Sequence, residues 1–159
     1  MNAIVVVGVG NLIRSDDGLG LHAMQRLAAD PRVPQRADAP VTFVDGGTRG
    51  LELVNDTADA SHVLILDAIE SDAEPGTLVS LTGGELASLP AGWSVHQLGI
   101  VDWMTALVML RGDAPVVQVL GLQPARIDWG TTLSPSVEGA LGRLVDAAVD
   151  QLQEWTAAR

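Results

Sequence analysis

Acidic residues follow three apolar runs of the sequence, in the glycine loop after the first run and directly at the end of the other two. These acids are Asp16, Asp17, Asp45 and Asp67. If the runs are parallel strands, their carboxyl ends meet at one edge of a sheet, which is where sites form in open α/β folds. His96 lies in a later loop, just before a predicted helix, and can reach the same edge. Carboxylates and one imidazole are suitable ligands for a divalent transition metal, which polarises a carbonyl and lowers the pKa of bound water.

Each of these residues also has a structural explanation. An Asp at the end of a strand often caps the following turn, and this explanation is strongest for Asp45, because two glycines follow it. One residue of the pair Asp16 and Asp17 is expected to cap the next helix, where the helix dipole also favours an acid. Asp67 has no glycine beside it and ends a run that should be buried, so a purely structural role fits it less well. A lone histidine such as His96 is more often a hydrogen-bonded loop residue than a ligand.

The elements that must position these residues alternate between strands and helices. Parallel strands are predicted over 3–7, 41–44, 63–66 and 116–122, and an antiparallel edge strand over 77–81. Helices are predicted over about 17–30, 51–56, 100–111 and 135–155. The helix over 100–111 is apolar on nearly every side and is expected to be buried, whereas 82–92 has the composition of a loop. Ser134 and Pro135 predict the start of the last helix, with the serine as its cap. The predicted fold is one α/β domain over residues 1–159, with a mostly parallel twisted sheet of about five strands and helices on both faces.

The glycine-rich loop after the first strand has two competing interpretations. Gly8 and Gly10 allow a tight turn, as in a dinucleotide-binding loop. Such a loop needs a third glycine where this chain has Ile13, and phosphates would meet two carboxylates. A loop that presents carboxylates to a metal or to a scissile bond fits these residues better.

The composition narrows the class of partner. The 159 residues are 47% hydrophobic and carry a formal net charge of −11, with no lysine. A surface of this charge repels a phosphate backbone, so nucleic acid is not an expected partner. The chain has no cysteine, which excludes disulfides and thiolate chemistry and is consistent with a reducing compartment. No apolar run approaches the roughly 20 residues that span a bilayer, so we expect a cytoplasmic protein that does not bind membranes.

Four short motifs, taken together and in this order, resemble those of the hydrogenase maturation endopeptidases. They are Gly8-Val9-Gly10-Asn11 with Asp16-Asp17-Gly18-Leu19-Gly20, Asp45-Gly46-Gly47-Thr48, Leu66-Asp67-Ala68, and His96-Gln97-Leu98-Gly99. Each motif is weak alone, but the set is specific and runs from Met1 to about Trp155.

The resemblance implies a single α/β domain that acts as an aspartyl-type protease. Members of this family remove a short C-terminal peptide from the large-subunit precursor of a nickel–iron hydrogenase after nickel insertion. The resemblance places the metal-contacting and catalytic residues at Asp17, Asp67 and His96. The nickel is expected to be carried by the precursor, and another divalent cation such as cadmium or zinc is expected to occupy the site in vitro. Asp16 would orient these residues or cap a helix, and the protein is expected to be a monomer.

Other functions stay open at this point. The chain could be a nucleotide-binding α/β protein, a non-catalytic chaperone that docks on the hydrogenase precursor, or a peptidase of the same fold with another substrate. Within the peptidase hypothesis, either a metal-bound hydroxide or a carboxylate general base could activate the water.

Overall fold

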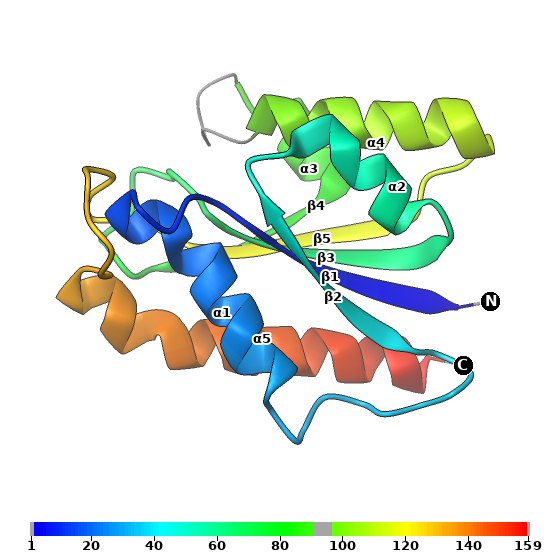
Figure 1. Ribbon diagram of the computed structural model, residues 1–159, viewed down its shortest axis with the longest axis horizontal. Helices are drawn as coiled ribbons and strands as arrows, with labels where there is room; N and C mark the ends of the chain where they lie inside the picture. Colours follow the sequence, from blue (N-terminus) through cyan, green and yellow to red (C-terminus); the bar gives the residue numbers. More distant parts are fainter. Residues whose placement is uncertain (1, 91–96, 159) are drawn as a thin grey trace.

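A computed structural model describes residues 2–90 and 97–158 of the chain. Five strands form one sheet in the order β2-β1-β3-β5-β4 (Figure 1). The strands are β1 (Ala3–Val9), β2 (Val41–Gly47), β3 (Ala60–Ala68), β4 (Leu78–Thr82) and β5 (Val116–Leu122). All neighbouring pairs are parallel except β4 and β5, so β4 is the antiparallel edge strand that the sequence predicts.

Helices cover both faces of this sheet (Figure 1). They are the short 3-10 helices η1 (Ser15–Gly18) and η2 (Gly50–Leu53) and the α-helices α1 (Leu19–Ala28), α2 (Val54–Thr57), α3 (Gly83–Ser88), α4 (Gln97–Arg111) and α5 (Pro135–Ala157). One core lies between the sheet and the pair α1 and α5, and a second lies between the sheet and α4 with its neighbours η2 and α3. The predicted α/β fold with two covered faces is confirmed.

The central strands are apolar throughout because both of their faces are buried. In β1, Ile4 and Val6 contribute to the core under α1 and α5, whereas Val5 and Val7 contribute to the core under α4. Side chains alternate between the two faces of a strand, so a strand with two covered faces needs an unbroken apolar run.

The prediction of a loop over 82–92 is wrong for its first part, which forms α3. Thr82 is the N-cap of this helix, and its hydroxyl accepts a hydrogen bond from the Glu85 N–H at 3.1 Å. The Glu85 carboxylate in turn accepts from the Thr82 N–H at 2.9 Å. This reciprocal capping box stabilises a helix that is too short to show an apolar period.

The prediction that α4 is buried on nearly every side is also wrong. Trp103 and Leu107 are buried against the sheet, but Met109 is 82% exposed and Leu110 is 71% exposed. Only one side of α4 meets the sheet, so the other apolar residues of its last turns face solvent. The helix also starts earlier than predicted, at Gln97 rather than near residue 100.

The final helix, α5, matches the predicted one closely. Its apolar residues line one face and pack on the sheet and on α1, and the ring of Trp155 lies 4.9 Å from that of His62. Among the helices within residues 2–90 and 97–158, none is both long enough and apolar enough to cross a membrane.

Candidate active site

The loop after β1 turns sharply and brings Asp17 back to the end of that strand. Gly10 has a φ of 137°, and a side chain there would overlap the carbonyl oxygen of Asp17. The Asp17 carboxylate accepts a hydrogen bond from the Asn11 N–H at 3.1 Å, and the Asp17 N–H donates to the Arg14 carbonyl at 3.1 Å. Asp17 is only 5% exposed, so its carboxylate is held inside the loop that it closes.

The second predicted acid, Asp67, lies within the carboxyl end of β3. It is 1% exposed, and its carboxylate accepts a hydrogen bond from the N–H of the next residue, Ala68, at 2.8 Å. Its neighbours by strand period, Ile65 and Ile69, belong to the core under α4. The Asp67 side chain therefore points to the face of the sheet that α4 covers.

Close packing of α1 on the sheet holds the loop that carries Asp17 next to the carboxyl end of β3, which carries Asp67. A Cβ at Gly20, in the first turn of α1, would overlap the carbonyl oxygens of Leu66 in β3 and Val9 in β1. Strands β1 and β3 are parallel neighbours, with Gly8 paired to Leu66. The structure thus places Asp17 and Asp67 at the same edge of the sheet. Contact of either carboxylate with a metal stays a prediction.

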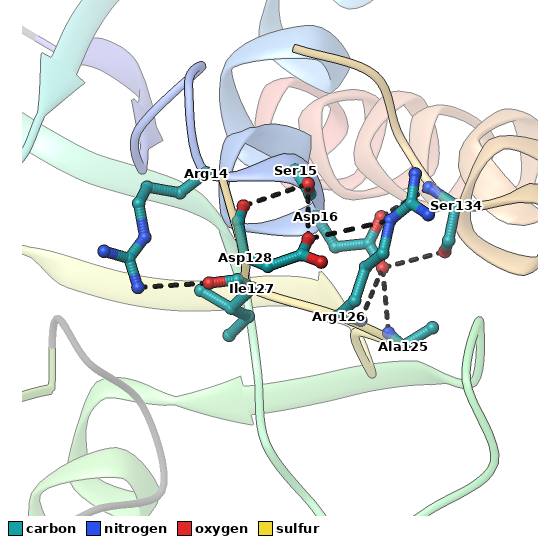
Figure 2. Close-up of polar contacts among 8 residues, drawn as sticks. All are labelled: Arg14, Ser15, Asp16, Ala125, Arg126, Ile127, Asp128 and Ser134. Carbon is teal, nitrogen blue, oxygen red and sulfur yellow. Dashed lines mark hydrogen bonds and ion pairs between the residues drawn. The ribbon is translucent and has the colours of Figure 1, made fainter. Parts of the chain in front are cut away.

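Asp16 does not cap a helix of its own segment, contrary to one expectation from the sequence. Neither η1 nor α1 begins with a side-chain cap bond. Instead, Asp16 is completely buried and accepts hydrogen bonds from the N–H groups of Ala125 (2.8 Å), Arg126 (3.1 Å) and Ser134 (2.7 Å). Figure 2 shows these bonds converging on the Asp16 carboxylate. The carboxylate thus ties the loop that carries Asp17 to the connection between β5 and α5.

Ser134 differs from its predicted role in a related way. It is the N-cap residue of α5, but its hydroxyl makes no capping bond to that helix. The hydroxyl donates to the Asp16 carboxylate at 2.7 Å instead. The start of α5 is therefore fixed by a residue more than a hundred positions earlier in the chain.

The residues next to Asp16 bind the same connection. The Ser15 N–H donates to the Gly130 carbonyl at 2.9 Å, and the Gly130 N–H donates to the Ile13 carbonyl at 3.0 Å. The Ser15 hydroxyl lies 3.0 Å from the carbonyl oxygen of Asp128 and 2.9 Å from its carboxylate (Figure 2). The sequence predicts no more than a connection over 124–132, because backbone hydrogen bonds to a distant segment leave no pattern in the sequence.

The second glycine motif forms the wall of a cavity at this edge. The cavity has a volume of about 180 Å³ and is lined by Gly46, Gly47 and Thr48, with Gly99 and Ile100 of α4 among its other residues. Neither Asp17 nor Asp67 is among the residues that line it. The cavity lies between the ends of β1 and β2 and the first turn of α4.

Asp45, which precedes this motif, has an exposed side chain. Its carbonyl oxygen accepts a hydrogen bond from the Arg49 guanidinium at 2.8 Å, and the backbone of Gly47 has a φ of 47°. The positive φ explains why position 47 is a glycine, because other residues rarely adopt this backbone conformation. The turn is therefore built by glycine and by the Asp45 backbone.

The predicted third ligand, His96, lies outside the described residues, so its side chain is not placed. It directly precedes Gln97, where α4 begins at the same edge of the sheet. Within residues 2–90 and 97–158, no three His, Cys, Asp or Glu side chains are grouped so that they could hold a metal ion. The role of His96 as the third ligand stays a prediction.

Comparison with known proteins decides the family. The model of the HycI hydrogenase maturation protease family matches residues 22–151. The chain belongs to this family of proteases. Of the curated relatives, the hydrogenase expression/formation protein HupD of Bradyrhizobium diazoefficiens is 33% identical over 157 residues, which cover 97% of this chain and 80% of HupD. The hydrogenase 2 maturation protease of Escherichia coli is 32% identical over 154 residues, covering 95% of this chain and 91% of that protein.

Solved structures of family members share the fold of this protease. The hydrogenase maturating endopeptidase HybD of Escherichia coli superposes with a TM-score of 0.82 at 29% identity, over 97% of this chain and 93% of HybD. The HybD protease of Thermococcus kodakarensis gives a TM-score of 0.80 at 26% identity, over 96% of this chain and 99% of that one.

Membership of this family makes the protein a peptidase and gives the buried carboxylates a chemical context. The earlier alternatives of a nucleotide-binding protein and of a non-catalytic chaperone are not supported. Amide hydrolysis needs a group that positions water and accepts its proton, and a group that stabilises charge on the carbonyl oxygen. Carboxylates held rigidly at the edge of the sheet can position water and accept its proton. They can also bind a cation, which would activate the water and stabilise the charge on the carbonyl oxygen.

Proposed function

We propose that this protease removes the C-terminal extension of the large-subunit precursor of a nickel–iron hydrogenase after nickel has been inserted. The curated relative in Escherichia coli is a hydrogenase 2 maturation protease, which supports a hydrogenase precursor as the substrate class. The placement of two buried carboxylates, Asp17 and Asp67, at one edge of the sheet is the observation that carries the proposal.

In this proposal the nickel belongs to the substrate. Asp17 and Asp67 supply oxygen ligands and His96 supplies an imidazole nitrogen, and nickel accepts both kinds of donor. A chain without cysteine cannot compete for the metal with thiolates, so the precursor retains it. The nickel would then hold the precursor in register, so that cleavage waits for metal insertion.

The burial of both aspartates supports a binding role over a purely local one. Each carboxylate is at least nine-tenths buried, and each has a hydrogen bond from a backbone N–H that fixes one oxygen. Fixed ligands lose little conformational entropy when they bind a cation. Either a carboxylate or the cation could then activate the attacking water, and aspartyl-type catalysis is the first of these two routes.

The test is cleavage of nickel-loaded precursor by variants with Asp17→Ala, Asp67→Ala or His96→Ala. Release of the C-terminal peptide is followed by mass spectrometry, with nickel-free precursor as the substrate control. We expect each variant to lose at least about a hundredfold in rate, the scale of a lost acid–base group or metal ligand.

A matched control is Asp45→Ala, which removes an exposed acid from the same edge of the sheet. This variant should cleave at the wild-type rate. Full activity in all three site variants would remove the proposed roles. The cytoplasmic location and the monomeric state stay predictions, which cell fractionation and light scattering of the purified protein can check.

A further inference from the structure

An exposed tryptophan stands beside the loop that carries Asp17. Trp129, in the connection between β5 and α5, is 73% exposed, whereas the other tryptophans whose burial the structure describes, Trp103 and Trp155, are at most 8% exposed. Ile13 is 51% exposed and Leu12 is 37% exposed. We name Leu12, Ile13 and Trp129 the rim patch.

The rim patch is held in a defined geometry. Arg14 and Gly130 form an isolated parallel β-bridge, in which the Gly130 N–H donates to the Ile13 carbonyl and the Ser15 N–H donates to the Gly130 carbonyl. The Arg14 guanidinium lies over the Trp129 ring, 5.0 Å from its centroid, and donates to the Ile127 carbonyl at 3.1 Å. One face of the indole is thus supported by a cation, and most of the ring still faces solvent.

The rim patch is continuous with the candidate active site. Leu12, Ile13 and Arg14 belong to the loop that Asp17 closes, and the Arg14 carbonyl accepts the Asp17 N–H. The buried Asp16 bonds anchor the strip that carries Trp129 to the same loop. A polypeptide bound with its scissile bond near Asp17 would therefore lie over or beside Trp129.

We infer that the rim patch docks the hydrogenase precursor next to its cleavage site, with Trp129 as the anchor that receives an apolar segment of the precursor. This inference rests on the proposed function for the identity of the occupant. Trp is enriched among residues that dominate binding energy at protein interfaces, because it buries a large rigid surface with few rotatable bonds. The Arg14 contact pre-orients the ring, so little freedom is lost on docking.

The test compares Trp129→Ala with wild-type protein on nickel-loaded precursor. We expect KM to rise by about tenfold or more, the scale of a truncated interface tryptophan, with kcat within about twofold of wild type. Trp129→Phe should recover most of the loss, because it keeps an aromatic anchor. The thermal midpoint of unfolding should not change, since the Trp129 ring is mostly exposed.

The matched control is Met109→Ala, which removes an even more exposed apolar side chain from the last turns of α4. The last turn of α4 lies near the start of β5, at the amino ends of the parallel strands and thus opposite the candidate active site (Figure 1). Met109→Ala should leave KM unchanged. A KM for Trp129→Ala equal to that of Met109→Ala, or a loss confined to kcat, would overturn the inference.

Binding is also measured directly, by calorimetry with the same precursor, so that docking and cleavage are judged separately. A wild-type chain that binds the precursor without cutting it would refute the proposed function, and weaker binding by Trp129→Ala would still support the docking inference. No binding by the wild-type chain would overturn the inference. A wild-type dimer that Trp129→Ala converts to a monomer, with KM unchanged, would reassign the rim patch to self-association and also overturn it.

Discussion

At the scale of single residues, Asp16 is the clearest case of a buried charge with a defined task. Its carboxylate has no exposed surface and accepts the N–H groups of Ala125, Arg126 and Ser134 together with the Ser134 hydroxyl. Hydrogen bonds to a charged acceptor are stronger than neutral ones. Removing one member of a buried network is destabilising, because it leaves the other buried polar groups without a partner. The neighbouring Asp17 therefore depends on Asp16 for its position.

We predict that Asp16→Asn lowers the free energy of unfolding by about 2–4 kcal/mol, because the amide turns two donors toward groups that are themselves donors. Urea unfolding at neutral pH measures this change. The control Asp45→Asn alters an exposed carboxylate and should stay within about 0.5 kcal/mol of wild type. A loss below about 0.5 kcal/mol for Asp16→Asn would contradict the structural role.

Single residues also show what the sequence could reveal about the site. Asp67 directly follows an apolar run and Asp17 lies in the glycine loop after another, so the sequence marks both as candidates, but it marks Asp16 and Asp45 equally. Only the resemblance to the maturation endopeptidases singles out Asp17 and Asp67. The partners of Asp16 were not predicted, because they are mainly backbone groups more than a hundred residues away. Trp129 was missed for a similar reason, since the exposure of an isolated tryptophan depends on how its loop folds.

At the scale of elements, the contact between α1 and the sheet determines where the site loop lies. Gly20 allows the first turn of α1 to approach the carbonyl oxygens of Val9 and Leu66, where a methyl group would overlap backbone atoms. These backbone atoms cannot rotate away as a flexible side chain can. Any added atom must therefore move the whole helix and the loop in front of it.

We predict that Gly20→Ala destabilises the protein by about 1–3 kcal/mol or more, the range seen when a tightly packed contact is overfilled. The same variant should also lose peptidase activity at temperatures where it stays folded, because the loop with Asp17 moves with α1. Urea unfolding and the precursor cleavage assay measure the two effects.

The matched control is Gly139→Ala in α5, where an added Cβ meets nothing within 4 Å. Alanine is the better helix former, so this variant should gain about 0.5–1 kcal/mol. If Gly20→Ala gained stability as Gly139→Ala should, the close approach of α1 to the strands would be wrong.

Most elements were predictable from the sequence, and the exceptions have physical causes. The strands were found because unbroken apolar runs are needed where both faces are covered. Helix α3 was missed because a helix of six residues has no readable apolar period, although the spacing of Thr82 and Glu85 gave a capping signal. The burial of α4 was overestimated because apolar character alone does not say how many neighbours a helix has.

At the scale of the whole molecule, an ion pair outside the site connects the loop after α1 to α5, and these two helices cover the same face of the sheet. Arg32, in the loop after α1, bonds to Asp30 at 2.8 Å and to Asp146 of α5 at 2.9 Å. Hydrogen bonds from Arg32 lower the pKa of Asp30 from 3.8 to about 2. Because the folded pKa is below the unfolded one, this pair stabilises the fold above pH 3.8, and the contribution is lost as the pH falls toward 2.

We therefore predict that Asp30→Asn is less stable than wild type at neutral pH and that the difference closes as the pH falls from 3.8 to about 2. Urea unfolding of both proteins across this range measures the difference. An NMR titration of wild-type protein checks the cause directly. A carboxyl of Asp30 that titrates near 3.8 would contradict it.

The long reach of Asp16 has a consequence for how this enzyme is made. Residue 16 is synthesised long before residues 125–134, so the Asp16 carboxylate of the nascent chain lacks its hydrogen-bond donors through most of synthesis. The loop that carries Asp17 reaches its folded form only when the connection before α5 has emerged and can donate its hydrogen bonds to Asp16. If Asp17 acts as proposed, a chain that stops short of residues 125–134 is expected to have no peptidase activity.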